Sequence, residues 1–379
     1  MRRIRVGLST TTVEHVLNKG HLDGIGVYTN ALLHDLPAVG CAVQGFSFPQ
    51  LGKPGLSRGF SAGRAMQRPF QLQSMRDMLL HDREHHRFPV DVFHSTDYRI
   101  VRMGCPVVAT LHDAIPLKFP EWCSPRLRSL KNWLQKKAAR KADQVIALSR
   151  YAVDELVEHF EIDEKRITVI HCGVGPEWHT RPEPEAVQAT LAEHALEAGY
   201  FLFVGTLQPR KNIARIIDAY LGLPAAVQRE RQLVIVGRPG WRCDDLVAKI
   251  HAAAQGGARI VWLNKLTSQE RLRHVYAGAG VFVFPSLHEG FGIPVAEAFA
   301  SGVPVVTSNT TSLPEVSMGA ALEINPLSVT DIGEAMQQLA LDEGLRARCI
   351  AAGHTRAATL TRQRTALETA AVYHAALGR

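Results

Sequence analysis

The feature that most restricts the fold is one continuous series of strand, loop, helix and strand signals in the second half of the chain. Val281–Phe284 is a short run of β-branched and aromatic residues, which is typical of a buried strand. Gly290 and Gly292 mark a loop after it, and Pro294 suits the first turn of a helix, where a missing N–H costs nothing. Pro304–Thr307 then predicts a second strand. This order is the repeating unit of a parallel α/β sheet.

The same alternation extends along both halves of the chain. Short apolar runs are separated by segments with helical periodicity, so they predict further strands. These predicted strands are Ile4–Leu8, Val90–His94, Pro106–Leu111, Gln144–Leu148, Ile167–His171, Tyr200–Gly205, Gln232–Val236, Arg259–Leu263 and Ala320–Ile324. The sequence therefore predicts an α/β protein with doubly wound parallel sheets, in which ligands bind beyond the carboxyl ends of the strands.

The length of 379 residues is large for one hydrophobic core and suits two domains. Residues 173–185 are rich in proline and glycine, so we expect the boundary there. The predicted domains are two Rossmann-like domains over residues 1–176 and 177–365, followed by a terminal helix over residues 366–379. Residues 50–89 look irregular and basic, and we expect either a loop that covers an acceptor or a disordered surface segment.

Composition fits a soluble globular protein, because 46% of the residues are hydrophobic and 21% are charged. The sequence contains no run of eighteen apolar residues, so it predicts no membrane-spanning helix. The N-terminal sequence also lacks the apolar core of a signal peptide. We therefore expect a cytoplasmic protein. Six cysteines without a C-x-x-C pair favour buried thiols over a zinc site or disulfides.

Positive charge is concentrated in the first half. The formal net charge is +7, and residues 177–379 hold equal numbers of basic and acidic side chains. Residues 125–142 contain seven basic side chains and no acidic one, with Leu130, Trp133 and Leu134 at helical spacing. This pattern indicates a helix packed on its own sheet with a solvated basic face, or one that docks residues 126–141 on an anionic membrane surface. Nucleic-acid binding is disfavoured, because no reading motif accompanies the charge.

Two glutamates bracket the glycine loop. Glu289 precedes the loop, and Glu297 lies about one turn into the predicted helix. A carboxylate can accept hydrogen bonds from paired hydroxyls, and a helix start offers N–H groups and a partial positive charge to phosphate or sugar oxygens. A solvated Glu289 and a Glu297 that serves only the helix dipole are the alternative. Two glutamates around two glycines and a proline favour a ligand site.

The segment E-G-F-G-I-P-V-A-E, followed by A-F-A-S-G-V-P-V-V, resembles the signature of the retaining glycosyltransferases of family 4. That family has the GT-B fold, in which two Rossmann-like domains face each other across a cleft. The resemblance implies that Glu289, with the backbone of Phe291, Gly292 and Ile293, holds the donor sugar. It implies that Glu297 holds ribose hydroxyls. It also implies that the N-terminal domain binds the acceptor and that the terminal helix crosses back to it.

Two cations follow the first strand of the second half, in the segment G-T-L-Q-P-R-K-N. Arg210 and Lys211 lie between a strand and a helix, where two cations suit a diphosphate. The resemblance implies that they clamp the diphosphate of the donor, with Lys211 at the position of the family lysine. The family arginine position holds Thr206, which is a departure, and we expect Arg210 to replace it.

Candidates at the next two strand ends are Arg238, past which a nucleotide could run, and Leu263 with Lys265. In the family the second of these loops contacts the base of the nucleotide through its backbone.

The first half holds the remaining candidates. Gly24 and Gly26 lie in a predicted glycine loop that the resemblance places near the donor diphosphate, and a turn that requires positive φ is the alternative. His112 ends a strand and resembles the active-site histidine that faces the donor sugar. Ser149 either lies near the substrate or caps the helix that follows it.

The expected activity is transfer of a hexose from a nucleotide diphosphate sugar to an acceptor hydroxyl, with retention of configuration as in the family. The segments H-D-A-I-P-L and G-T-L-Q-P-R-K-N look like bacterial mannosyltransferases of surface-polysaccharide assembly, so GDP-mannose is the expected donor and a UDP-sugar the alternative. A lipid-linked saccharide acceptor at the inner face of the plasma membrane is implied as well. No D-x-D or H-E-x-x-H occurs, so we predict no metal and no cofactor. A nucleotide-sugar epimerase and a non-enzymatic basic binding module are the rival functions.

Overall fold

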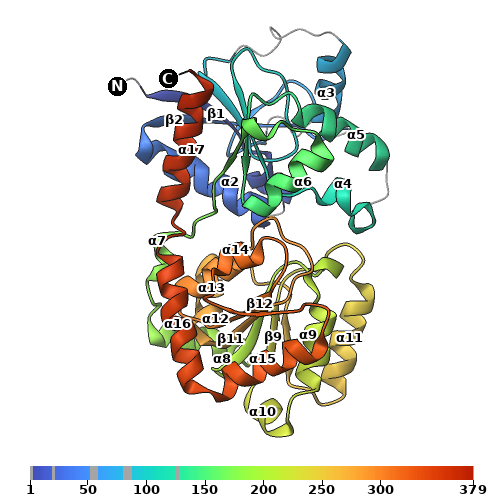
Figure 1. The fold of residues 1–379 in the computed structure, drawn as a ribbon, viewed down its shortest axis with the longest axis vertical. Coiled ribbons are helices and arrows are strands. Elements are labelled where there is room, and N and C mark those ends of the chain that lie inside the picture. The colour runs from blue at the N-terminus through green and yellow to red at the C-terminus, as the bar shows by residue number, and fades with distance from the viewer. Residues whose placement is uncertain (1–2, 19–21, 52–58, 80–87, 124–127, 379) are drawn as a thin grey trace. The chain divides into compact units, whose positions relative to one another are not determined.

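The computed structural model describes residues 3–18, 22–51, 59–79, 88–123 and 128–378. The chain forms two compact units, Met1–Cys172 with Arg362–Arg379, and Gly173–Thr361. Each unit contains one parallel β-sheet with helices on both faces (Figure 1). The predicted fold class of two doubly wound, Rossmann-like units is therefore confirmed.

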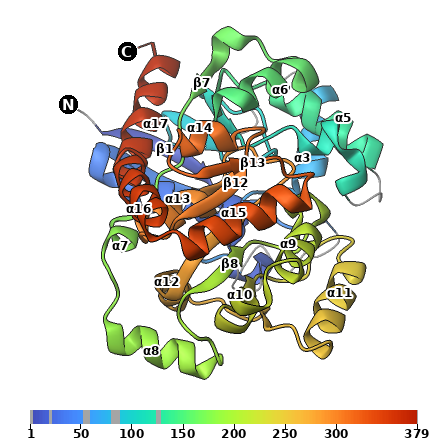
Figure 2. The same ribbon diagram turned by 60° about the horizontal axis from the view of Figure 1, so that its bottom comes forward.

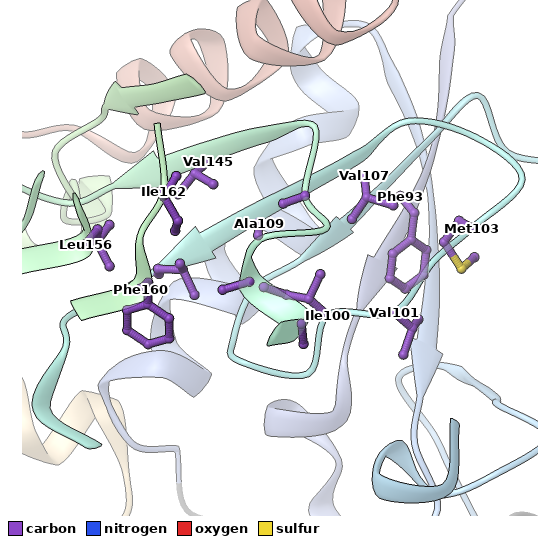
Figure 3. Close-up of a cluster of buried hydrophobic side chains, with 14 of the residues drawn as sticks. Phe93, Ile100, Val101, Met103, Val107, Ala109, Val145, Leu156, Phe160 and Ile162 are labelled. Carbon is purple, nitrogen blue, oxygen red and sulfur yellow. The ribbon is translucent and has the colours of Figure 1, made fainter. Parts of the chain in front are cut away.

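The first unit has a seven-stranded sheet in the order β3-β2-β1-β4-β5-β6-β7. Its strands are β1 (Ile4–Ser9), β2 (Cys41–Ser47), β3 (Arg64–Ala65), β4 (Val92–Ser95), β5 (Val107–Leu111), β6 (Gln144–Ala147) and β7 (Ile167–Val169). Its α-helices are α1 (His15–Asn18), α2 (Gly24–Asp35), α3 (Phe70–Leu79), α4 (Ile115–Lys118), α5 (Arg128–Ala139), α6 (Arg150–Phe160) and α17 (Arg362–Ala376). Helices α3, α5 and α6 cover one face of the sheet, and α2 and α17 cover the other (Figure 1). The core under α5 and α6 contains Phe93 and Val107 of the strands with Leu156 and Phe160 of α6 (Figure 3).

The second unit has a six-stranded sheet in the order β10-β9-β8-β11-β12-β13. Its strands are β8 (Tyr200–Val204), β9 (Leu233–Val236), β10 (Ile260–Leu263), β11 (Ala279–Phe284), β12 (Val305–Ser308) and β13 (Leu322–Ile324). Its helices are α7 (Pro176–His179), α8 (Pro184–Glu193), α9 (Ile213–Leu221), α10 (Ala225–Glu230), α11 (Asp244–Gln255), α12 (Gln269–Gly278), α13 (Ile293–Ala300), α14 (Leu313–Ser317), α15 (Val329–Leu341) and α16 (Glu343–Ala357). Figure 2 brings this unit forward and shows α15 in front of the sheet, next to α9.

Every predicted strand is present within a few residues of its predicted bounds, but β2 and β3 were not predicted. The middle of β2 holds Gln44 and Gly45, which weaken the apolar signal that identifies buried strands. The expectation of an irregular segment over residues 50–89 is wrong for its described part, which contains β3 and α3. Residues 52–58 and 80–87 of that segment lie outside the described residues.

Helix α17 is attached to the first unit by buried polar groups. Tyr373 hydrogen-bonds the ring of His94 at 2.7 Å, and the other ring nitrogen bonds Thr110 at 2.8 Å. Tyr28 of α2 bonds the same threonine hydroxyl at 3.0 Å. Burial lowers the pKa of His94 to about 3, so the ring is neutral and stays in the network without a counter-ion. The terminal helix therefore completes the sheet face that α2 covers.

Candidate active site

The strand order of the second unit reverses between β8 and β11, and the loops that follow these two strands lie side by side. Ligands in doubly wound sheets bind at such a reversal, beyond the carboxyl ends of the strands. The backbone of the two loops is joined directly, because the N–H of Leu287 donates to the carbonyl of Arg210 at 2.7 Å. The Arg210 guanidinium also donates to the carbonyl of His288 at 3.1 Å. The fold therefore brings the predicted cations and the predicted glutamate loop together.

Glu289 lies between both predicted cations. Lys211 Nζ is 2.6 Å from one carboxylate oxygen of Glu289, and Arg210 Nη1 is 3.0 Å from the other. Glu289 is only 7% exposed, so the alternative of a solvated loop glutamate is wrong. Burial by itself would raise the pKa of Glu289, but the charges of Lys211 and Arg210 outweigh it and bring the pKa down to about 2. The carboxylate is therefore ionised at neutral pH and fixes the position of both cations.

Two residues that the sequence did not single out hold these loops in place. Asn212 has a left-handed backbone with φ of 61°, and its amide donates to the carbonyls of Pro285 and Pro326 at 2.9 and 2.6 Å. The Ser312 hydroxyl lies 2.9 Å from the carbonyl oxygens of both Glu289 and Phe291. Asn212 carries a weak local signal, because asparagine tolerates left-handed backbone. Ser312 carries none, because its partners are distant in sequence.

Helix α13 begins directly after the glycine loop, as predicted. Gly292 adopts φ of 113°, which favours glycine, and it precedes Ile293 and Pro294 in the first turn. A side chain at position 292 would also meet Leu313 at 2.8 Å. The start of α13 thus carries a partial positive charge a few residues after Glu289 and suits anionic or hydroxyl oxygens.

Glu297 lies on α13, is 7% exposed, and accepts a hydrogen bond from the Tyr276 hydroxyl at 3.2 Å. Burial raises the pKa of Glu297 to about 7, the bond from Tyr276 works against this rise, and the nearby Glu177 adds to it. Among the residues that the structure describes, no cation compensates the charge of Glu297 as Lys211 compensates that of Glu289. The two glutamates of the motif therefore differ in charge: one is firmly ionised, and the other titrates near neutral pH.

The weaker candidates of the second unit lie at the neighbouring strand ends. The N–H of Leu207 donates to the carbonyl of Arg238 at 2.9 Å, so the loop after β9 lies against the cation loop. The N–H of Gly237 donates to the carbonyl of Leu263 at 3.1 Å. Arg238 and Leu263 are half-buried, whereas Lys265 is exposed. The structure places Arg238 beside the main cluster and Lys265 on the surface.

His112 of the first unit ends β5 and is buried. Its Nε2 lies 2.9 Å from the carbonyl oxygen of Thr96. Because a carbonyl only accepts, Nε2 carries the proton, and Nδ1 of the neutral ring is left as an acceptor. Burial lowers the pKa of His112, while the Thr96 carbonyl and the charges of nearby aspartates, Asp113 first and then Asp23, oppose that.

The prediction that Gly24 and Gly26 lie in a glycine loop is wrong. Both residues lie in the first turn of α2. Neither has a positive φ, so the alternative of a strained turn is also wrong. Asp23 caps this helix, since its carboxylate accepts from the N–H of Gly26 at 2.8 Å. A side chain at Gly26 would crowd Leu22 and the carbonyl of Thr12, whereas Gly24 has open space around it. Gly26 therefore allows close packing against its neighbours, and Gly24 leaves the backbone accessible.

Ser149 caps α6, because its hydroxyl accepts from the N–H of Ala152 at 3.1 Å. This agrees with the structural alternative that the sequence offered. Among the described residues, no three His, Cys, Asp or Glu side chains lie together as a metal site requires.

Two family models match most of the chain. "Glycosyltransferase Family 4" matches residues 22–178, and "Glycosyl transferases group 1" matches residues 192–356. The "O-antigen chain mannosyltransferase B" of Escherichia coli is 30% identical over 88% of this chain and 91% of its own length. The chain belongs to glycosyltransferase family 4. A second Escherichia coli relative of the family, "Serotype-specific mannosyltransferase WbdA", is 31% identical over 62% of this chain and 29% of its own length.

Solved structures support the fold of this family 4 chain. "Sucrose-phosphate synthase (tll1590) from Thermosynechococcus elongatus" superposes with a TM-score of 0.75 at 19% identity, over 98% of this chain and 99% of the other. The two units are thus those of the GT-B fold, and the protein is a glycosyltransferase enzyme. No helix within the described ranges has the length and apolar character that crossing a bilayer requires.

Proposed function

We propose that this glycosyltransferase moves a mannosyl group from GDP-mannose to the hydroxyl of a saccharide acceptor, with retention of configuration and without a metal ion. The observation that carries the proposal is the Glu289 cluster at the strand reversal of the second unit. Mannose is favoured because a relative that is 30% identical over 88% of this chain is named a mannosyltransferase. A UDP-sugar donor is the alternative of the same fold.

The cluster supplies what the departure of a nucleoside diphosphate requires. As the bond between the sugar and the diphosphate breaks, negative charge grows on the leaving oxygen and needs fixed positive groups close to it. Arg210 and Lys211 supply two such groups, α13 begins shortly after Glu289, and Glu289 holds both cations in one arrangement before the donor arrives. In this proposal the loop from Glu289 to Ile293 holds the donor sugar, and Glu297 accepts hydrogen bonds from ribose hydroxyls.

Thermal unfolding with nucleotides tests the donor. GDP and GDP-mannose at about a hundred times their dissociation constants should stabilise the folded protein by about 2.7 kcal/mol, while UDP, UDP-glucose and ADP leave it unchanged. A shift with the UDP compounds alone would keep the reaction and replace the donor. No shift with any compound would contradict the proposed nucleotide donor, and a product that is only isomerised donor would contradict the proposed transfer. Turnover that chelator abolishes and Mg²⁺ restores would contradict the metal-free mechanism.

We also propose that the acceptor is lipid-linked and that helix α5 docks the enzyme on an anionic membrane surface. The helix buries Leu134, Ala138 and Ala139 against its own unit. Its outer side carries Leu130 at 48% and Trp133 at 50% exposed, together with exposed Lys131 and Lys137. Exposed apolar side chains flanked by lysines suit the boundary between lipid headgroups and acyl chains. Arg126 and Leu127 of the predicted surface lie outside the described residues.

Not every basic residue of α5 is available for this contact. Lys136 and Arg140 bind Glu161 at 2.7 and 2.9 Å, so their charges are partly compensated. Replacing Trp133 with alanine and both Lys131 and Lys137 with glutamate should therefore remove at least about nine-tenths of the binding to vesicles containing phosphatidylglycerol, at roughly 1 kcal/mol for each lysine. Sedimentation with vesicles measures this. Arg348→Glu, a charge reversal at an exposed site of α16, is the control. Equal sedimentation of the triple variant and the parent would remove the docking proposal.

A further inference from the structure

The loop after β9 continues the register of the sheet and places Arg238 opposite Thr206. Strands β8 and β9 pair in parallel up to Val204 and Val236. Beyond the strands, Leu207 still pairs with Pro239 as a parallel bridge, which is the same register three residues on. Position 206 therefore faces position 238 across the two loops.

Close backbone packing fixes the two loops to each other. A Cβ at Gly237 would overlap the carbonyl oxygen of Gly205, so only glycine permits this approach. The N–H of Gly240 donates to the carbonyl of Leu207 at 3.0 Å, and Gly240 also lies against Gln208. The side-chain oxygen of Gln208 in turn accepts from Arg210 Nε at 3.1 Å. The loop that carries Arg238 is thus continuous with the cation cluster.

The net charge of Arg210, Lys211 and Glu289 is too small to balance a nucleoside diphosphate. Lys211 and Arg210 both bind Glu289, so these three groups together carry one net positive charge. A nucleoside diphosphate that leaves a sugar carries more negative charge than that. Arg238 is half-buried, and its guanidinium has no hydrogen bond or ion pair with any residue that the structure describes. Burying a guanidinium without a partner is costly, so a ligand that pairs with it gains affinity.

We propose that Arg238 is a third diphosphate-binding cation of the donor site, which it reaches from β9 across Thr206. This inference rests on the proposed function, since it requires a nucleotide diphosphate donor. Neighbouring strands are about 4.8 Å apart, and opposed residues point to the same side of the sheet, so an arginine side chain spans the distance from one strand to the next. Arg238 therefore contacts the diphosphate and stabilises the charge that develops on it as the sugar leaves.

The register supplies a rescue experiment. Arg238→Ala should weaken GDP binding and lower kcat/KM with GDP-mannose by about ten- to hundredfold, the range for one lost charge-assisted hydrogen bond, while guanosine binds as before. Adding Thr206→Arg to Arg238→Ala should restore at least half of the lost GDP affinity and half of the lost kcat/KM. The reason is that position 206 lies opposite position 238, from which the arginine was removed. Arg242→Ala, which removes an exposed arginine of the same loop, is the control for net charge. Calorimetric titrations with GDP and guanosine measure the binding.

Each outcome decides something separate. Equal GDP affinity and equal turnover of Arg238→Ala and the parent would overturn the inference, as would a loss of guanosine binding as large as that of GDP binding. A double variant no better than Arg238→Ala would overturn the placement of Arg238 opposite Thr206. A parent protein that binds neither GDP nor UDP would instead refute the proposed function. Melting temperatures of all variants show whether each one is folded. Arg238→Lys, which keeps the positive charge at this position, is measured in the same way.

Discussion

Replacing Glu289 with glutamine is expected to lower transfer at least a hundredfold and to destabilise the folded protein at the same time. The carboxylate holds Lys211 Nζ at 2.6 Å and Arg210 Nη1 at 3.0 Å in a buried position. Removing one partner of a buried ion pair costs about 3–5 kcal/mol, because the remaining charge stays buried without compensation. Transfer falls because the cations that should meet the diphosphate lose their arrangement, and a single lost electrostatic contact of this kind costs about 10²–10³ in kcat.

The matched control is Glu161→Gln. Glu161 also pairs with two cations, Lys136 at 2.7 Å and Arg140 at 2.9 Å, but its side chain is 52% exposed. Exposed pairs contribute about 0–1 kcal/mol, so this variant should unfold within about 1 kcal/mol of the parent and retain full transfer. Urea unfolding and steady-state turnover measure both variants. A Glu289→Gln enzyme with near-parental turnover would remove Glu289 from the reaction, whatever its stability.

Acid should weaken the same cluster. The pKa of Glu289 is about 2 in the folded protein, against an ordinary value of 4.5. Its pairing therefore contributes stability in full above about pH 4.5, and that contribution is lost as the pH falls from there towards 2. Glutamine at position 289 cannot titrate, so the acid limb of the stability profile should flatten in the variant between these values.

The sequence predicts the fold correctly where the apolar pattern of a segment agrees with its position in the sheet. Buried central strands such as β8 and β11 are continuous apolar runs, and they were predicted close to their observed bounds. Strand β2 was missed because Gln44 and Gly45 interrupt its apolar run, and a parallel neighbour on each side supplies the pairing that its own composition does not. Gly24 and Gly26 suggested a loop by their type, yet the Asp23 cap and packing on Leu22 start a helix at that position.

The site was readable only as far as one segment carries it. Glu289, Gly292 and Glu297 lie within one loop and helix, so their spacing indicated a ligand site. The partners that set their chemistry come from far along the chain. Lys211 controls the ionisation of Glu289, and Tyr276 with Glu177 affects that of Glu297. Nothing in the local sequence shows which buried carboxylate receives a cation, although that pairing decides its charge.

Replacing Glu297 with glutamine should stabilise the protein and weaken donor binding. Burial raises the pKa of Glu297 to about 7, so the folded protein carries an unfavourable buried charge above that pH. Because the folded-state pKa lies above the unfolded one, the group contributes stability below about pH 4.5 and loses it as the pH rises to about 7. Glutamine avoids this loss, so the free energy of unfolding of the variant should exceed that of the parent by about 3 kcal/mol at pH 8 and match it near pH 4.5. Urea unfolding at both pH values measures the difference.

The opposite effect on the donor follows from the proposed contact with ribose hydroxyls. An ionised carboxylate accepts from both hydroxyls, whereas glutamine offers one acceptor and no charge, so GDP affinity at pH 8 should fall about tenfold or more. Below pH 7 the GDP affinity of the parent should fall towards that of the variant as Glu297 takes up a proton, whereas the affinity of the variant should not change. Glu177→Gln is the control, since its charge raises the pKa of Glu297; its profile should move to lower pH with affinity at pH 8 unchanged. If Glu297→Gln binds GDP with the affinity and pH dependence of the parent, Glu297 does not hold the ribose, and its buried charge needs another explanation.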